Sequence, residues 1–585
     1  MSHDKSPFFA PSTPRVIAQT PGGTKRSIKK TVEENKSSVV GAMANLINAI
    51  VGAGIVGIPF AIQQAGLVAG VVLVCICALL TDKSLRLLVE TAKHASTPSY
   101  ETTMEAAFGR PGFLFVCINM FIMSYGAMVS YLMIVKETLP YVFGISDLGS
   151  RRALLFLVSL LVMVPLSSQR DMANLAQTSR ISVCLDIVMV GLVAYIAPIS
   201  ATLESHGGFW NLLQQSTLRI DTVFVGLGVL SFAFVCQHSA FIIAGSLEQP
   251  TKERWSCVTL RALWVCALLA NLCGITGYLG YMDDTQGNIL NNLPQNGLLP
   301  NAARGLLGVT MLFVYPMESF VARHVCVVTF FAGRRAHEGD DATILNRRDR
   351  RIGLTVTLYI LALVPALLFE NLGSVLSVTG AIGGSCLSYI GPGALYLGIH
   401  GGEFVKMAKE FWNMGGRQDL EMQPLRGNSA PAPQLEDSNL TKMCKTILWY
   451  LLGMPVWYNM AKVGAEGFSS YKQALVLKSP HPSRLGKVKR RAGPACETIT
   501  RSGSNPNITY QGGPQIAMIL PPTNPGVFKA PPRRILQQQQ QQDEEEDDPQ
   551  ESPQLMDFVI AVSYMLFGLV ALSAGLLSIF AAQGR

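Results

Sequence analysis

Long apolar runs along this chain alternate with short polar and charged connections. Eleven runs are long enough, or nearly so, for a helix to cross a bilayer, which takes about 20 residues. They are Val39–Gln63, Leu67–Val89, Gly112–Pro140, Ala153–Ser168, Ile181–Ala201, Val223–Leu247, Cys257–Tyr281, Ala303–Phe331, Ile352–Glu370, Ser374–Ile399 and Met556–Ala582. The pattern predicts an all-α polytopic membrane protein.

The first run differs from an ordinary spanning helix. Three glycines and a proline interrupt it, at Gly52, Gly54, Gly57 and Pro59. Glycine costs about 1 kcal/mol and proline about 3 kcal/mol relative to alanine in a helix interior, so the helix should unwind here. Unwound backbone at membrane depth is tolerated only inside protein or beside a wet cavity, and the amides of a half-helix attract carboxylates. The run therefore predicts a binding site near the membrane midplane.

Two other interpretations of the glycines stay open at this point. The spacing Gly52-x-Gly54-x-x-Gly57 matches a dinucleotide-binding pattern, but that pattern needs a preceding strand and a soluble βαβ unit. Small residues also allow two membrane helices to pack closely. Close packing is compatible with a binding site, whereas the apolar context argues against a nucleotide.

The sixth run, Val223–Leu247, carries the polar residues Cys236, Gln237 and His238 at its centre. The first and sixth runs are corresponding members of two five-helix halves. Interrupted segments in corresponding positions point to a transporter site.

Several other side chains are candidates for chemistry within the spans. Ionisable groups at membrane depth are functional hypotheses by default, and here they include Asp186, His238 and Glu318. His238 either carries a proton or is hydrogen-bonded in a wet pocket. Tyr125 and Tyr131 of the third run either close over a substrate or pack within the bundle.

Composition excludes several functions. Only 15% of residues are charged, and the twelve cysteines fall mostly within apolar runs, which favours free thiols over disulfides or metal sites. There is no nucleophile with an adjacent base, no metal-ligand spacing and no phosphate-binding loop, so we expect neither an enzyme nor a cofactor. The net charge of +8 comes from connecting loops and does not indicate nucleic acid.

Lysine and arginine in the loops predict the orientation, because they accumulate on the cytosolic side. A cytosolic N-terminus places most of them inside, including the cluster Arg334, Arg335, Arg347, Arg348, Arg350 and Arg351. With eleven spans, Arg585 then lies outside or in a lumen.

We expect four regions along the chain. Residues 1–37 form a disordered basic cytosolic tail, and residues 38–400 form a ten-helix core. Residues 401–554 form a mostly disordered cytosolic insert of low complexity, with an interfacial helix near 447–461. Residues 555–585 contain the eleventh span and the C-terminus.

Several short stretches occur together in one known family. They are Asn48–Pro59, Thr81–Leu85, Ser130-Tyr131, Phe232–Cys236 with His238, Ser246–Pro250, and Tyr315–Glu318 with Arg323. With these stretches the chain resembles the amino acid/auxin permeases, and within them the sodium-coupled neutral amino acid transporters.

This resemblance implies a LeuT-type fold, with two inverted five-helix repeats and an eleventh helix, and secondary transport of amino acids by alternating access. By position, backbone amides near Gly52, Ala53, Gly54, Ile55 and Gly57 would hold the substrate carboxylate. Carbonyls near Phe232, Ala233 and Phe234 would hold its amine, with Tyr125 as a further candidate contact.

The resemblance does not decide which ion is coupled to transport. Asn48 matches a residue implicated in cation binding, but the threonine expected shortly before Pro316 is absent. Val314 and Leu312 stand there, and the nearest upstream hydroxyl is Thr310. The candidate coupling residues are thus Asn48, Thr310, His238 and Asp186, with either H⁺ or Na⁺ as the coupling ion.

We therefore expect a transporter of neutral L-amino acids in the plasma membrane or a vacuolar or endolysosomal membrane. Its partners would be the amino acid, the lipid bilayer and possible cytosolic proteins that bind the tail and insert. A membrane amino-acid sensor that signals through those cytosolic segments is the alternative.

Overall fold

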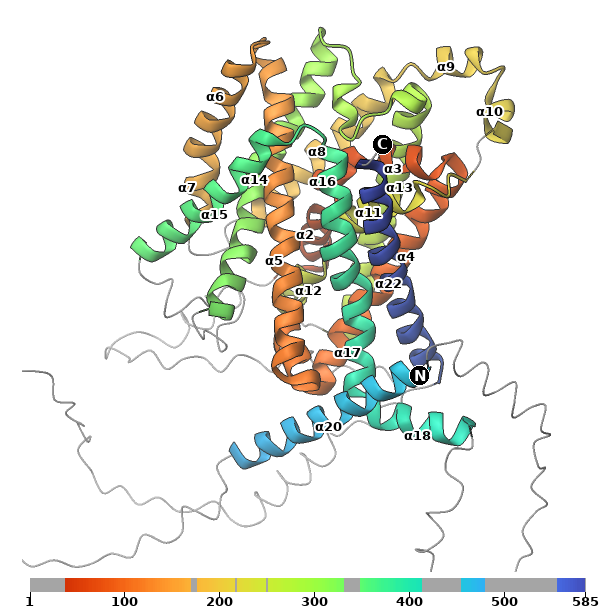
Figure 1. Ribbon diagram of the computed structural model, residues 1–585. Helices are drawn as coiled ribbons and strands as arrows, with labels where there is room; N and C mark the ends of the chain where they lie inside the picture. The colour runs from red at the N-terminus through yellow and green to blue at the C-terminus, as the bar shows by residue number, and fades with distance from the viewer. Residues whose placement is uncertain are drawn as a thin grey trace, which may run out of the picture. The chain divides into compact units, whose positions relative to one another are not determined.

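The computed structural model describes residues 37–169, 176–215, 218–248, 251–330, 348–412, 454–478 and 555–583. In this part of the chain ten helices are long and apolar enough to span a membrane, and a bent helix pair makes an eleventh (Figure 1). The predicted class, an all-α polytopic membrane protein, is confirmed. The tail 1–36 and most of the insert lie outside the described residues.

The helices of the first half cover the first five predicted spans. They are α2 (Val39–Ile50), η1 (Ala53–Gly57), α3 (Ile58–Ala65), α4 (Leu67–Ala95), α5 (Tyr100–Val142), α6 (Leu148–Val158), η2 (Ser159–Met163), α7 (Val164–Ser167), α8 (Ala176–Ile196), α9 (Ile199–Ser205) and α10 (Phe209–Gln215).

The second half begins with the interrupted sixth span and ends with the tenth. Its helices are α11 (Val223–Ala233), α12 (Gln237–Ser246), α13 (Lys252–Tyr281), η4 (Met282–Asp284), η5 (Ile289–Asn291), α14 (Leu298–Phe330), α15 (Arg348–Leu368), α16 (Leu372–Thr379), η6 (Gly380–Gly384), η7 (Cys386–Ile390) and α17 (Gly391–Ile399). Then follow α18 (Gly401–Trp412), α20 (Met454–Lys478) and α22 (Leu555–Gln583).

The third span begins earlier than its apolar run. Ser99 caps α5 through a reciprocal pair of hydrogen bonds with Thr102, and the helix then bends at Gly109, whose φ of 64° interrupts the helical backbone. The apolar run that starts at Gly112 is the part after this bend. Polar residues before it form a helical turn because the cap satisfies the first free N–H groups.

The spans pack in two sets. In one set α13 lies against α2, α3 and α4, and α11 lies against α3. In the other, α5 packs along α14, and both contact α15. α8 touches both sets through α2, α13 and α14, so the broken first and sixth spans share one set and face the long helices α5 and α14.

The insert contributes a helix that differs from the expected one. Residues 447–453 lie outside the described part, and α20 extends well beyond 461, to Lys478. Trp457, Ala461 and Phe468 of α20 are buried, so this part of the helix packs on protein and does not lie in the headgroup region alone. The interfacial helix near 447–461 therefore stays a prediction, and close packing through small residues on one face of α20 is a feature that hydropathy does not reveal.

Candidate functional site

The first span is broken where the glycines predict it. α2 ends at Ile50, and Val51 and Gly52 leave the helical backbone with ψ angles of 50° and −133°. η1 and α3 follow, with Pro59 in the first turn of α3, where a proline costs no hydrogen bond. The two parts of the span are bent by 44°.

The sixth span has a matching break. α11 ends at Ala233, residues 234–236 are not helical, and α12 begins at Gln237. The carbonyl of Phe234 accepts a hydrogen bond from the Thr81 hydroxyl of α4 at 3.5 Å. Breaks in both spans are the arrangement that the five-plus-five interpretation predicts.

Gln237 holds the second break in place. Its Oε1 accepts hydrogen bonds from the Cys236 N–H at 3.0 Å and the Ser388 hydroxyl at 2.9 Å. Its Nε2 donates to the Ser84 hydroxyl at 3.2 Å, so one buried amide joins the second, sixth and tenth spans. The polarity of Gln237 is evident from the sequence, but this role is not, because it depends on two distant serines.

The two breaks lie against each other. A Cβ atom added to Gly54 would lie 2.5 Å from Cα and 2.6 Å from Cβ of Ala233. At Gly57 it would lie 2.7 Å from Leu376 Cδ1, whereas at Gly52 it would lie 3.2 Å from the Tyr131 hydroxyl. Gly54 and Gly57 therefore permit close packing, which supports that interpretation, while Gly52 faces a tyrosine hydroxyl.

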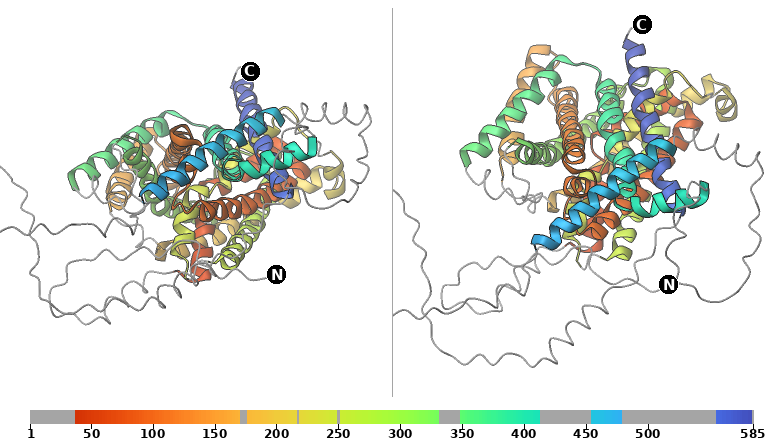
Figure 2. Two further views of the ribbon diagram at one scale, coloured as in Figure 1. Left: turned by 90° about the horizontal axis from the view of Figure 1, so that it is seen from below. Right: turned by 60° about the horizontal axis from the view of Figure 1, so that its bottom comes forward.

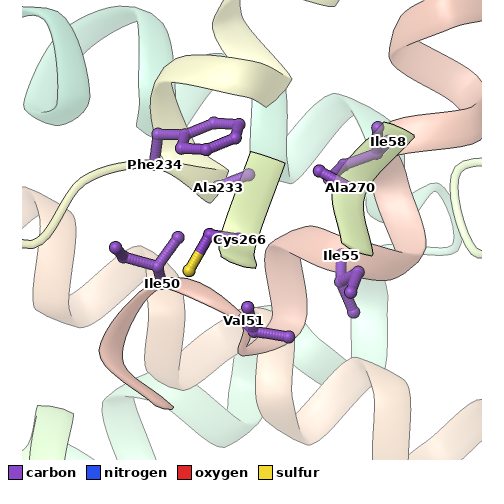
Figure 3. Close-up of a pocket in the computed structure, with 8 residues that line it drawn as sticks. All are labelled: Ile50, Val51, Ile55, Ile58, Ala233, Phe234, Cys266 and Ala270. Carbon is purple, nitrogen blue, oxygen red and sulfur yellow. The ribbon is translucent and has the colours of Figure 1, made fainter. Parts of the chain in front are cut away.

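A small apolar pocket lies beside the contact between the breaks (Figure 3). Its lining comes from the first, sixth and seventh spans: Ile50, Val51, Ile55, Ile58, Ala233, Phe234, Cys266 and Ala270. Ile55, Ala233 and Phe234 are among the predicted substrate contacts. The lining of this pocket is apolar apart from one thiol and contains no charged side chain.

The structure does not bring Tyr125 to these residues. Its hydroxyl donates a hydrogen bond to the Leu361 carbonyl of α15 at 2.7 Å. Tyr131, six residues later on α5, is the tyrosine that reaches Gly52. The sequence alone does not distinguish the two tyrosines, because the rotation of α5 about its axis decides which one faces the break.

The candidate coupling residues fall into two groups: Asn48 and His238 contact side chains of α14, and Asp186 and Thr310 are neighbours of each other. Asn48 of α2 donates to the Met317 sulfur of α14 at 3.7 Å, and His238 Nε2 lies 3.3 Å from Glu318 Oε1. Asp186 of α8 is only 1% exposed, and neither carboxylate oxygen has a hydrogen-bond partner among the described residues. The neighbouring Thr310 hydroxyl donates to the Leu306 carbonyl at 3.0 Å.

A membrane-spanning bundle with two facing helix breaks at its centre defines the class of secondary transporters. Comparisons with known proteins show which family within this class the chain belongs to. Residues 35–414 match the sequence model of a family described as transmembrane amino acid transporter protein. The chain belongs to this family.

Named relatives agree with this placement. The chain is 32% identical over 364 residues to "Putative sodium-coupled neutral amino acid transporter 11" of Bos taurus, covering 61% of this chain and 75% of that protein. It is 28% identical over 386 residues to "Vacuolar amino acid transporter 2" of Saccharomyces cerevisiae, covering 64% and 79%. A solved Na⁺-coupled sialic acid symporter aligns at 12% identity and a TM-score of 0.44, covering 64% of this chain and 85% of that one.

Proposed function

We propose that this protein carries neutral L-amino acids across a membrane by alternating access, with the substrate bound between the two helix breaks. Family membership supports amino acid transport. The observation that carries the site is the contact of η1 with the end of α11, beside a pocket without charged side chains. Backbone groups at the breaks suit the carboxylate and amine common to amino acids, and the pocket suits an apolar side chain.

We further propose that protons drive transport through Asp186. A buried carboxylate without a hydrogen-bond partner is costly in its charged form, so it takes up a proton or a cation. Val314 and Leu312 supply no oxygen where the family's threonine would stand, which disfavours sodium. His238, another of the candidates from the sequence, already faces Glu318, and Asp186 is therefore the residue we propose.

The surroundings of Asp186 contain few other titratable groups. Tyr131 of α5 interacts with it electrostatically, and α2, which packs on α8, carries no titratable residue. α13 presents Cys266 and Cys273 near its middle, and α14 presents Tyr315 and Glu318 beyond Thr310. Asp186 is thus our first candidate for the acid that takes up the coupled proton.

Uptake into proteoliposomes tests both proposals. A panel of labelled amino acids should show accumulation of neutral ones under an inward proton gradient, with little change when choline replaces sodium. Asp186→Asn should abolish accumulation but keep exchange of labelled for unlabelled substrate, because exchange needs no net ion movement. Ser182→Ala, a buried change one turn away on α8, is the matched control and should keep accumulation.

Two results would contradict these proposals. Absence of uptake for every amino acid, with specific binding retained, would favour the sensor. Steep sodium dependence with flat pH dependence would overturn proton coupling and make Thr310 the residue to mutate.

Topology and location are also proposed here. The loop charges favour a cytosolic N-terminus, and a vacuolar or endolysosomal membrane is favoured by the name of the yeast relative. Cytosolic proteins that bind the tail and insert remain part of the proposal, since α20 gives the insert direct contact with the core.

A further inference from the structure

The half-helix before the first break, α2, and the half-helix after the second break, α12, are joined at the ends that lie away from the breaks. The Ser37 N–H donates to the Ser246 carbonyl at 2.8 Å, and the Glu248 N–H donates to the Ser37 carbonyl at 2.9 Å. Ser37 lies just before α2, and Ser246 is the last residue of α12. Backbone bonds at one end and non-helical backbone at the other make α2 and α12 one linked unit.

Side chains near the breaks connect this unit to α14. His238, in the first turn of α12, places Nε2 3.3 Å from Glu318 Oε1 of α14, and these side chains are 5% and 11% exposed. Asn48, in the last turn of α2, donates to the sulfur of Met317, the residue before Glu318. Adjacent residues of α14 therefore contact both members of the unit.

The His238–Glu318 pair lies between the two packing sets. The broken spans belong with α4 and α13, whereas α14 packs along α5. Opening a path from this side to the breaks requires α2 and α12 to move away from α14. Such movement separates His238 from Glu318, and water entering the path can then solvate both groups.

The energetics of such a pair suit a reversible contact. With His238 protonated the pair is ionic, and a buried ionic pair gains attraction but loses hydration, so its two states lie close in free energy. Removal of one partner takes this attraction away while the other side chain stays buried, which favours the open, hydrated state. An apolar contact of the same area would not be compensated by hydration when its two sides separate.

We infer that His238 and Glu318 form a latch that holds α2 and α12 closed against α14, and that its release opens the path to the breaks from the side of the N-terminal tail. The two are positioning residues and do not bind substrate. This inference rests on the proposed transport function, but the test below follows thiol access and needs no substrate.

Cys236, fully buried at the second break and one residue before α12, reports whether the path is open. The purified full-length protein is treated with N-ethylmaleimide, and labelling of Cys236 is followed by mass spectrometry. Cys77 of α4, which is also fully buried, is the internal reference. Glu318→Gln and His238→Gln keep side-chain volume and remove the charge pairing.

We expect each variant to raise the Cys236 labelling rate about tenfold, as a charged hydrogen bond of this kind would imply, and to leave Cys77 unchanged. The double variant should label no faster than the single ones, because both remove the same contact. The exchange His238→Glu with Glu318→His should return the rate toward that of the unmodified protein.

The chain offers a matched control in a second buried pair, His324 Nε2 and Glu101 Oε1, at 3.7 Å. It joins α14 to α5 within one packing set, so His324→Gln should leave Cys236 labelling unchanged even if it lowers thermal stability. Melting temperatures of all variants separate loss of stability from opening.

Unchanged labelling in folded Glu318→Gln and His238→Gln would overturn the latch, as would equal acceleration by His324→Gln. If neither single variant folds, the exchange variant decides the question. Slow labelling there supports the latch, and fast labelling refutes it. Failure of amino acid uptake in the unmodified protein would refute the transport proposal alone.

Discussion

Gly54 provides the most direct test of the close approach between the two breaks. Its backbone φ is not in the left-handed region, so alanine is conformationally allowed there. A Cβ atom would nevertheless lie 2.5 Å from the Ala233 Cα, about 1 Å inside an ordinary van der Waals distance. Because the obstructing atom belongs to the backbone, no side-chain rotation relieves the clash.

Overpacking of this kind costs about 1–3 kcal/mol, which corresponds to roughly 5- to 150-fold in an equilibrium between closed and separated breaks. Gly54→Ala should therefore lower the maximal uptake rate by about this factor while protein yield changes little. Gly54→Leu should abolish uptake. Ala233→Gly in the Gly54→Ala background should restore part of the activity, since it removes the methyl group at 2.6 Å and leaves only the backbone atom of residue 233 in the way.

The assay is uptake into proteoliposomes, normalised to reconstituted protein, with melting temperature measured in parallel. Gly191→Ala is the matched control, because a Cβ on that spanning-helix glycine meets no atom within 4 Å. Normal uptake and stability in Gly54→Ala would refute close approach of the breaks. Equal loss of folded protein and uptake would assign Gly54 to helix packing alone.

Three further predictions concern the membrane topology, the loop that contains Asn288 and Asn291, and the pH dependence of stability. Tags at the N-terminus and in the insert should be cleaved by cytosolic protease while a tag after Arg585 is protected; an insert protected together with the C-terminus would contradict the eleven-span arrangement. Glu137→Gln should lower thermal stability by about 1–3 kcal/mol, because the carboxylate accepts hydrogen bonds from Asn288 Nδ2 at 2.8 Å and Asn291 Nδ2 at 2.9 Å; an unchanged melting temperature would show that the loop is held elsewhere. Burial, with smaller contributions from His94 and Lys472, lowers the pKa of His400 from 6.5 to about 4. Between these values the unfolded chain binds the proton more readily, so stability should fall as pH drops through this range, and melting curves of His400→Gln should lose that dependence.

The sequence was sufficient to predict the elements whose cause is local. Gly52, Gly54 and Gly57 weaken a helix interior and Pro59 cannot continue a helix that precedes it, so the first break could be predicted, and hydropathy alone marks the spans. Contacts between distant residues could not be predicted in this way. The orientation of Tyr125 toward α15, the pairing of His238 with Glu318 and the burial of Asp186 depend on helix rotation and packing. Small differences in helix phase, which a single sequence does not reveal, decide each of them.

The close approach of α20 to the core also bears on how this protein can be divided. A Cβ atom on Gly464 would clash with the Gly398 Cα, and one on Gly467 would clash with the Ala107 carbonyl oxygen. The compact unit that contains the spans accordingly includes α20 up to Lys472 and also α22, and α20 lies across one end of the bundle (Figure 2). The boundary between the compact unit and the rest of the insert thus falls within α20, not at the end of the tenth span. A chain cut at Gly401 would lose α20 from the compact unit, whereas a chimera that replaces only residues 473–552 would keep α20 up to Lys472 and the eleventh span α22.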